Sequence, residues 1–272
     1  MRSSLPFGLA LALGASLVAC GEEGAPALAT EPAPAPALAT PTPPAPQTSP
    51  PPSDEVCAQV IVVQWRGATG APESIARSEA DARQRAEELL QRIESGAAEF
   101  AEVARTESDA RGSGARGGLI GTYAHDDWPP QHEAIRERAF AMQVGETSEV
   151  LRAPYGWVIL HRCVAEHRHT RHVLVRFRGA RNAPEDVTRS REEARALAAQ
   201  IRERLVAPGA DFEAIAREVS EDGSRERGGD MGWLGRGRLA PAYEEAAFTL
   251  GVGQISEPIE TEFGFHVIQR VE

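Results

Sequence analysis

The chain of 272 residues has few cysteines and a deficit of basic charge. Its three cysteines are too few for a disulfide-rich scaffold, although they leave room for one pair. The formal net charge of -11 argues against general binding to nucleic acid or anionic surfaces, because such binding needs a basic face that displaces counterions. We therefore expect no nucleic-acid partner. The 20 prolines are unevenly placed, so part of the chain is not expected to be globular.

The first 53 residues do not have the pattern of a folded domain. Arg2 precedes an apolar run at residues 5–19, which has the length of a signal-peptide hydrophobic region and is too short to span a bilayer. The run ends in Leu-Val-Ala-Cys20, which resembles a bacterial lipobox. We expect a signal peptide over residues 1–20 and a lipid on Cys20. The alternative is an ordinary secretory signal with a chance cysteine.

Residues 21–53 consist mostly of alanine, proline and threonine. Such a segment has too little apolar bulk to fold and favours extended polyproline II structure. We expect a disordered tether. Together with the lipid, it would place the protein on the periplasmic face of the bacterial cell envelope, and Gly21 after Cys20 favours the outer over the inner membrane.

The remaining residues contain an internal repeat, which determines the number of domains. The segment Trp-Arg-Gly-Ala at residues 65–68 matches Phe-Arg-Gly-Ala at residues 177–180, with a separation of 112. Glu-Arg-Ala-Phe at residues 137–140 matches Glu-Ala-Ala-Phe at residues 245–248, with a separation of 108. Both copies are therefore expected to share one fold.

Each copy begins with a β-branched segment and continues with helical patterns. The strands are expected at residues 60–63 and 173–175. The first helix of the second copy starts at a capping box of Ser190 and Glu193, and its partner starts at Ser78. The buried face of the helix that starts at Ser190 is expected to carry five residues: Ala194, Leu197, Ala198, Ile201 and Leu205. Further helices and final strands follow, which predicts an α+β fold with a small antiparallel sheet flanked by helices.

The end of the second copy resembles the parvulin family of peptidyl-prolyl isomerases. The resemblance rests on Arg-Gly-Gly-Asp-Met-Gly-Trp-Leu-Gly at residues 227–235, Pro-Ala-Tyr-Glu-Glu-Ala-Ala-Phe at residues 241–248 and Thr-Glu-Phe-Gly-Phe-His-Val-Ile at residues 261–268. These segments have the order and spacing of the family, and the resemblance extends back to His172. We expect a parvulin-like catalytic domain at residues 166–272 and a degenerate, non-catalytic copy at residues 54–165.

The resemblance implies a catalytic centre beside a pocket for the proline ring, with no metal and no cofactor. The centre would contain His172, Asp222, Thr261 and His266. The pocket would contain Met231, Leu234, Leu239, Tyr243 and Phe263. Met231 and Tyr243 could instead be plain core residues, and that interpretation is preferred for Trp233 and Phe248.

The first copy differs from the second at these positions. The separations of 112 and 108 place Val60 opposite His172 and Val158 opposite His266. Ile135 falls opposite Tyr243, and Ala110 falls opposite Asp222, although a gap could instead align Asp109 there. We therefore expect any isomerase activity in the second copy alone.

The resemblance also implies that Cys57 and Cys163 lie on adjacent antiparallel strands and form a disulfide in an oxidising compartment. The histidines between residues 161 and 172 superficially suggest a metal site. Metal ligands must converge from fixed positions, whereas this run crosses a linker between two strands. We expect solvated linker histidines, apart from His172, and no metal.

The leading hypothesis is a lipid-anchored peptidyl-prolyl cis-trans isomerase that assists folding in the bacterial envelope. Its partners would be unfolded or partly folded exported proteins with Xaa-Pro bonds, and it would reach the membrane through its N-terminal lipid only. The main alternative is a holdase chaperone that binds extended client segments with little isomerase activity. A third possibility is a structural envelope lipoprotein that uses the fold to bind a fixed partner.

Overall fold

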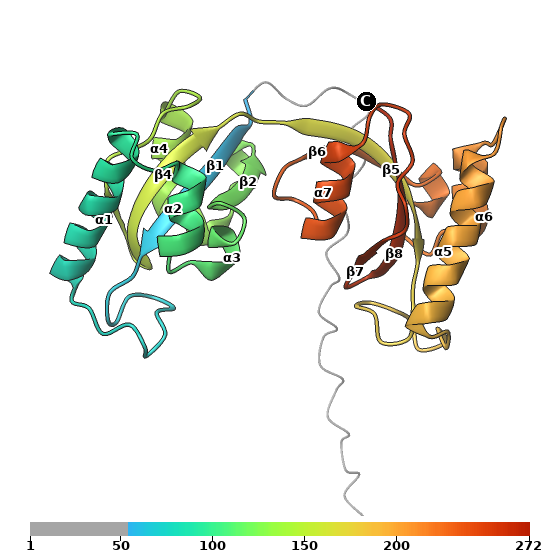
Figure 1. Ribbon diagram of the computed structural model, residues 1–272, viewed down its shortest axis with the longest axis horizontal. Coiled ribbons are helices and arrows are strands. Elements are labelled where there is room, and N and C mark those ends of the chain that lie inside the picture. The colour runs from blue at the N-terminus through green and yellow to red at the C-terminus, as the bar shows by residue number, and fades with distance from the viewer. Residues whose placement is uncertain (1–53) are drawn as a thin grey trace, which may run out of the picture. The chain divides into compact units, whose positions relative to one another are not determined.

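The computed structural model describes residues 54–272, so the expected signal peptide, Cys20 and the tether over residues 21–53 lie outside the described residues. The described chain contains two four-stranded antiparallel sheets, each flanked by helices (Figure 1). This confirms the expected α+β fold. None of the helices in this part of the chain is both long and apolar enough to cross a bilayer.

The first sheet has the strand order β2-β1-β4-β3. Its strands are β1 (Val56–Val63), β2 (Leu119–Tyr123), β3 (Leu151–Ala153) and β4 (Gly156–Cys163). The helices are α1 (Glu79–Glu94), α2 (Phe100–Glu107), α3 (Arg111–Gly114) and α4 (Arg136–Ala141), with 3-10 turns at His125–Asp127 and Pro130–Ile135.

The second sheet has the equivalent order, β6-β5-β8-β7. Its strands are β5 (His167–Val175), β6 (Asp230–Gly235), β7 (Ile259–Thr261) and β8 (Gly264–Arg270). The helices are α5 (Arg191–Val206), α6 (Phe212–Val219) and α7 (Pro241–Thr249), with a 3-10 turn at Arg225–Arg227.

Equivalent hydrogen bonds show that the repeat extends to single residues. Ser108 Oγ accepts from the backbone N–H of Val62 at 3.1 Å, and Ser220 Oγ, 112 residues later, accepts from Leu174 N–H at 3.1 Å. The central strands also share their register, since Val60 pairs with Leu160 and His172 pairs with Ile268. The two alignments made from sequence are therefore correct.

The helices start where their capping residues predict. Ser78 and Ser190 each form a capping box, in which the side chain accepts from the third helical N–H while the acidic side chain at that position accepts from the cap N–H. On α5, Ala194, Ala198 and Ile201 are buried as expected. Leu197 is 36% exposed, so its assignment to the buried face is wrong. The helix has only a narrow stripe against the sheet, and Leu197 lies at its margin.

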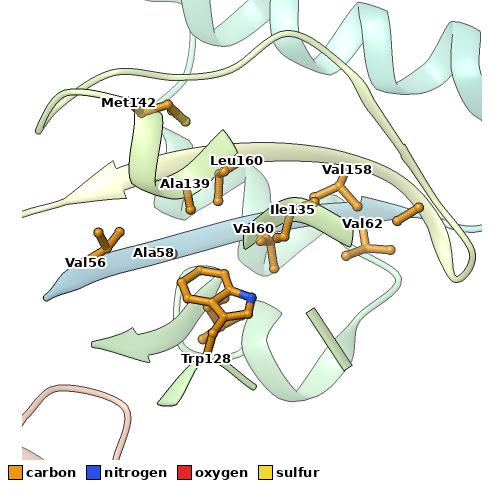
Figure 2. Packing of buried hydrophobic residues seen from close by; sticks show 12 residues of the cluster. Val56, Ala58, Val60, Val62, Trp128, Ile135, Ala139, Met142, Val158 and Leu160 are labelled. Carbon is orange, nitrogen blue, oxygen red and sulfur yellow. The ribbon is translucent and has the colours of Figure 1, made fainter. Parts of the chain in front are cut away.

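Each sheet has its own apolar core on both faces. In the first domain, one face packs Val60, Val158 and Ile135 around Trp128 (Figure 2), and the other packs Ile61 against α1 and α2. In the second domain, α5 and α6 cover one face and α7 covers part of the other. No cluster mixes the two sets of residues, so each domain has an apolar core of its own.

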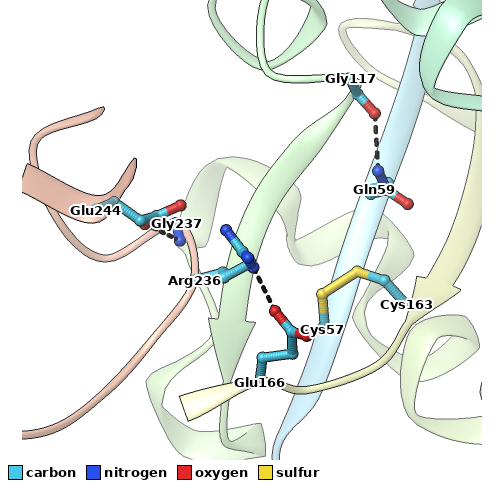
Figure 3. The surroundings of a disulfide bond; sticks show 8 residues. All are labelled: Cys57, Gln59, Gly117, Cys163, Glu166, Arg236, Gly237 and Glu244. Atoms are coloured by element: carbon cyan, nitrogen blue, oxygen red, sulfur yellow. Dashed lines mark hydrogen bonds and ion pairs between the residues drawn. A yellow bond between two sulfur atoms is a disulfide. The ribbon is translucent and has the colours of Figure 1, made fainter. Parts of the chain in front are cut away.

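A disulfide joins the two central strands of the first domain's sheet. Cys57 on β1 lies directly opposite Cys163 on β4, with Cα atoms 5.0 Å apart, and the two sulfurs are bonded (Figure 3). The bond connects the two ends of the domain, which are 106 residues apart in sequence. Beside it on β1, the side-chain amide of Gln59 donates to the carbonyl of Gly117 at 2.9 Å.

Candidate active site

Two neighbouring strands bring His172 and His266 together. Strands β5 and β8 are antiparallel, and their register places His172 opposite Ile268 and His266 opposite Leu174. The histidines are thus diagonal neighbours on one face of the sheet. Their Nδ1 atoms lie 3.0 Å apart, and both side chains are buried, with exposures of 3% and 5%.

The loop before β6 needs glycine to fit beside this strand. Gly229 has a φ of +80°, and its carbonyl accepts from His172 N–H at 2.9 Å. A Cβ atom at Gly229 would lie 2.2 Å from the carbonyl oxygen of His172, which is far inside van der Waals contact. The glycine pair of the Arg-Gly-Gly segment therefore positions β6 against the histidine strand.

Thr261 supports His266 from the neighbouring strand. Its Oγ1 lies 2.8 Å from His266 Nε2 and accepts from Phe263 N–H at 3.1 Å. Thr261 is itself buried at the end of β7. Both nitrogens of the His266 ring therefore have a partner in the protein.

Asp222 lies at the other end of the histidine pair, in the turn after α6. Its Oδ1 accepts from Ser224 N–H at 2.8 Å and lies 3.1 Å from His172 Nε2. The approach of the imidazole falls outside good hydrogen-bond geometry. The contact between Asp222 and His172 is therefore an electrostatic one. Asp222 keeps 22% of its side chain exposed, so solvent can reach it.

The pKa of Asp222 is held well below its usual range. Burial alone would raise this pKa, but the hydrogen bond and charge of His172 and the hydrogen bonds from Ser224 outweigh it. Asp222 is therefore a carboxylate near pH 7.

The pKa of His266 is lowered to about 3, first because burial disfavours its charged form and second because of repulsion from His172. His266 is therefore neutral near pH 7, with one N–H. In this form one ring nitrogen of His266 faces His172 Nδ1 and the other shares a hydrogen bond with the hydroxyl of Thr261.

Tyr243 packs its ring edge against both histidines. It lies on α7, nearly perpendicular to His266 with ring centroids 5.3 Å apart and to His172 with centroids 5.5 Å apart. Its hydroxyl lies 3.2 Å from Thr170 Oγ1, and burial raises the pKa of Tyr243 well above its usual value. The aromatic ring thus closes one side of the histidine pair.

The other expected pocket residues lie just before α7, on β6 and after β7. Leu239, just before α7, packs against the cluster that contains Tyr243. Met231 is half-buried at the bulge in β6, beside the pair of Thr170 and Gly232. Phe263 is half-buried in the turn between β7 and β8, which carries Thr261.

Leu234 lies further from the histidines than the other expected pocket residues. It is buried on β6 opposite Arg168, which is four residues along β5 from His172, or roughly 13 Å along the strand. The structure therefore brings Thr261, Asp222 and Tyr243 to the histidines and leaves Leu234 at the far end of the strand.

Two contributors to the site did not stand out in the sequence. Thr170 holds the Tyr243 hydroxyl, and Ser224 holds Asp222. Thr170 precedes His172 by two residues, so the strand period could have placed it on the same face. Ser224 had no comparable signal, because its role depends on a turn.

The histidines before His172 are not solvated linker residues, so that prediction is wrong. Strand β5 starts at His167, and the side chains of His167 and His169 are only 9% and 13% exposed. His169 Nε2 lies 2.8 Å from Asp230 Oδ1. Strand pairing with β6 buries this segment, which sequence patterns alone had assigned to a loop. Within residues 54–272, no group of three or more His, Cys, Asp or Glu side chains is placed to hold a metal ion.

The first domain fills the equivalent positions with hydrocarbon. Val60 and Val158 occupy the places of the histidines, and Ile135 occupies that of Tyr243; all three are fully buried (Figure 2). The Asp109 carboxylate accepts a hydrogen bond from Gln64 N–H. In the second domain, the Glu221 carboxylate accepts the equivalent bond from Arg176 N–H, so Asp109 corresponds to Glu221. Ala110 is thus the true counterpart of Asp222, and the first domain has no carboxylate there.

Comparison with known proteins agrees with the two-domain description. The rotamase family model, described as the PPIC-type PPIASE domain, matches residues 68–163 and again residues 172–272. "Chaperone SurA" of Methylobacillus flagellatus is 36% identical over 197 residues, which cover 69% of this chain and 42% of the relative. "Chaperone SurA" of Chromobacterium violaceum is 33% identical over 204 residues, covering 70% and 44%. The chain spans less than half the length of these curated relatives.

Among solved structures, peptidyl-prolyl isomerase ESS1 from Candida albicans is 32% identical over 39% of this chain and 63% of its own, with a TM-score of 0.38. This score adds no argument to the family match.

Proposed function

Because this chain belongs to the PPIC-type peptidyl-prolyl isomerase family, whose model matches most of the chain in two segments, we propose that the second domain catalyses cis-trans isomerisation of Xaa-Pro bonds. The buried group of His172, His266, Thr261 and Asp222 beside Tyr243 carries this proposal. The first domain has hydrocarbon at the equivalent positions and is assigned no catalysis.

The reaction needs a pocket more than it needs a reactive group. Rotation about a peptide bond has a barrier of about 18 to 20 kcal/mol, because the planar amide is stabilised by resonance. The twisted amide has lost this resonance and carries less negative charge on its oxygen. An apolar pocket that holds the proline ring therefore favours the twisted form, and each preference of about 1.4 kcal/mol accelerates the reaction about tenfold.

The residues of the second domain suit these requirements. Tyr243, Leu239 and Met231 would hold the proline ring at the open side of the histidine pair. The Asp222 carboxylate would lie near the substrate carbonyl and would destabilise the planar amide, whose oxygen is more negative, more than the twisted one. His172, His266 and Thr261 would hold the pocket walls and Asp222 in place, with no proton transfer to the substrate.

An assay of a proline-containing tetrapeptide with the full chain tests the proposal. We expect acceleration by the unchanged protein, a loss of about tenfold or more in kcat/KM for Asp222→Asn, and no loss for Ala110→Asn at the matched position of the first domain. No acceleration by a folded, unchanged protein would contradict the proposal.

A second candidate function is holdase activity toward extended polypeptides. Two observations favour it: the matched relatives are named chaperones, and the first domain is a complete fold without the catalytic group. The test is suppression of client aggregation by the full chain carrying Asp222→Asn. Full suppression without isomerase activity would favour the holdase, and loss of both together would favour the enzyme.

We further propose that the protein acts in the bacterial envelope on exported, incompletely folded clients and is anchored through a lipid on Cys20. The support is the apolar run followed by the lipobox-like segment, together with a disulfide of the kind that forms in oxidising compartments. Expressed in a bacterium, the protein should partition into detergent and carry a lipid-sized mass increase on its N-terminal peptide. A soluble, unmodified periplasmic form would contradict the anchor.

A further inference from the structure

The first domain has a pocket that its missing catalytic group does not explain. It measures about 380 Å³ and lies among α1, α2 and α3. The helices α1 and α2 cover the face of the sheet that carries Ile61, whereas Val60 and the other counterparts of the catalytic residues belong to the opposite face. The pocket therefore lies away from Val60, Val158 and Ile135, and its nearest approach to these counterparts is at Asp109 and Arg111, which flank Ala110.

The lining of the pocket is rich in arginine. It contains Arg77, Arg85, Arg105 and Arg111 together with Glu107 and Asp109, which leaves an excess of two positive charges. All 29 basic residues of the chain are arginines, and the whole chain has a net charge of -11. The guanidinium groups of this lining repel one another, and a bound anion would offset that repulsion.

One of these arginines belongs to the architecture of the fold. Arg77 is paired with Asp109, which also accepts from Gln64 N–H at 2.8 Å. The second domain repeats this arrangement with Arg189 and Glu221, whose nearest atoms lie 2.7 Å apart. This shared pair stabilises the start of the first helix in both copies and does not need a ligand.

Arg105 differs from its counterpart in the second domain. The equivalent residue, Arg217, pairs with Glu213 at 3.2 Å one turn earlier on α6. The position equivalent to Glu213 in the first copy is Ala101. Within residues 54–272, Arg105 forms no ion pair, so its charge is left for another group.

Arg111 and Arg85 have no basic counterpart at all. At a separation of 112 their equivalents are Gly223 and Leu197. In the part of the chain that the structure describes, Arg111 pairs with no carboxylate. Arg85 contacts Glu107, which it shares with Arg92, while its Nε–H is buried without an acceptor. Around this cavity the first copy has therefore gained two arginines, and within residues 54–272 Arg105 and Arg111 pair with no carboxylate.

We propose that this pocket binds the dianionic phosphate of a phosphate monoester through Arg85, Arg105 and Arg111. The planar guanidinium fork matches the oxygens of phosphate and can donate to two of them at once. A phosphate monoester carries about -1.5 to -2 charges at pH 7, which balances the excess of the lining. The phosphate can belong to a soluble metabolite or to a lipid head group. The site is independent of the isomerase activity.

Calorimetric titration of the full chain with glycerol 3-phosphate tests the proposal. We expect saturable binding that weakens as salt is raised. The side chains of Arg105 and Arg111 are both exposed, so the protein should remain folded when either is replaced by Gln. Each should weaken binding by about tenfold or more, because each removes charge-assisted hydrogen bonds, and the double variant should abolish it.

The matched control is Arg83→Gln with Arg195→Gln, which removes the same charge from exposed positions on α1 and α5 outside the pocket lining. This pair should leave the affinity within about twofold, since exposed charges outside the lining are screened and donate no hydrogen bond to the ligand. No saturable binding, or equal weakening by the control pair, would overturn the site. Equal affinity for succinate, a dicarboxylate of the same charge, would overturn the assignment to phosphate.

Vesicles identify the source of the phosphate. Binding to phosphatidylcholine vesicles that contain phosphatidic acid, lost in the double arginine variant, would support a lipid head group. Binding of glycerol 3-phosphate without binding to those vesicles would support a soluble ligand. In both outcomes, catalysis by the second domain should be unchanged, so failure of this proposal is distinguishable from failure of the isomerase proposal.

Discussion

At the scale of single residues, the candidate site depends on keeping ionisable groups in defined charge states. Asp222 stays ionised because its partners outweigh burial, and His266 stays neutral because burial dominates. The pKa of both groups is thus lowered, which leaves Asp222 charged and His266 neutral. The consequences can be measured as a dependence of stability and activity on pH.

The lowered pKa of His266 predicts that the protein loses stability as pH falls. Its pKa is about 3 in the folded state and 6.5 in the ordinary state, so the unfolded chain binds more protons between these values. The contribution is fully present above about pH 6.5 and is lost as pH falls toward about 3. Between pH 7 and 5, where Asp222 does not titrate, His266→Ala should reduce the slope of unfolding free energy against pH.

This variant should also be less stable than the unchanged protein at pH 7, because it leaves the buried Nδ1 of His172 and Oγ1 of Thr261 with fewer partners. Urea denaturation at the two pH values measures both effects. An unchanged pH slope in the variant would show that His266 is not buried as a neutral group.

Tyr243 allows the ring and the hydroxyl to be tested separately. Tyr243→Ala should cost about 3 to 5 kcal/mol of stability and most of the activity, because it removes a buried aromatic wall. Tyr243→Phe keeps the ring and loses only the contact with Thr170, so it should cost about 1 kcal/mol and leave kcat/KM within about threefold. Thermal unfolding and the tetrapeptide assay provide the measurements. Equal losses in both variants would assign the effect to the hydroxyl.

At the scale of elements, the disulfide is the clearest feature to test. Strands β1 and β4 are the central pair of the first sheet, and the Cys57–Cys163 bond closes the loop that contains nearly the whole domain. A long closed loop restricts the unfolded chain, so its removal should matter even though β1 and β4 remain paired.

Replacing both cysteines by serine should lower the stability of the first domain by about 2 to 5 kcal/mol. Activity at temperatures below unfolding should not change, because the proposed site lies in the second domain. Denaturation of oxidised and reduced protein, with the double serine variant as the reference, measures the effect. A reduced protein as stable as the oxidised one would contradict it.

At the scale of the whole molecule, the two copies share a fold and differ in chemistry. Their strand registers coincide, yet the histidine positions of the second copy are valines in the first. The first copy in turn has arginines where the second has glycine and leucine. The proposed functions are therefore divided between the domains, with isomerisation in one and anion binding in the other.

This division predicts different activities for the two halves. A fragment of residues 166–272 should accelerate isomerisation of a proline peptide, and a fragment of residues 54–165 should not. Each half contains its own sheet and apolar clusters, so both should fold, which circular dichroism can verify. Equal activity in the folded halves would show that the residues assigned to the site are not decisive.

The sequence by itself determined the features that depend on short-range patterns or on spacing. Capping residues predicted the starts of α1 and α5, the internal repeat predicted two copies of one α+β fold, and the separations of 112 and 108 placed Val60 and Val158 opposite the two histidines. These predictions succeeded because helix caps act within one turn, and because an internal repeat preserves the register of a fold.

Only the tertiary structure decided which side chains are buried and which groups meet. It showed that β5 begins at His167, that Leu197 is exposed, and that Thr170 reaches the hydroxyl of Tyr243. It also gathered Arg85, Arg105 and Arg111 from three helices around one pocket. Burial and convergence depend on how strands pair and helices pack across long sequence separations, and no local pattern in the sequence specifies that.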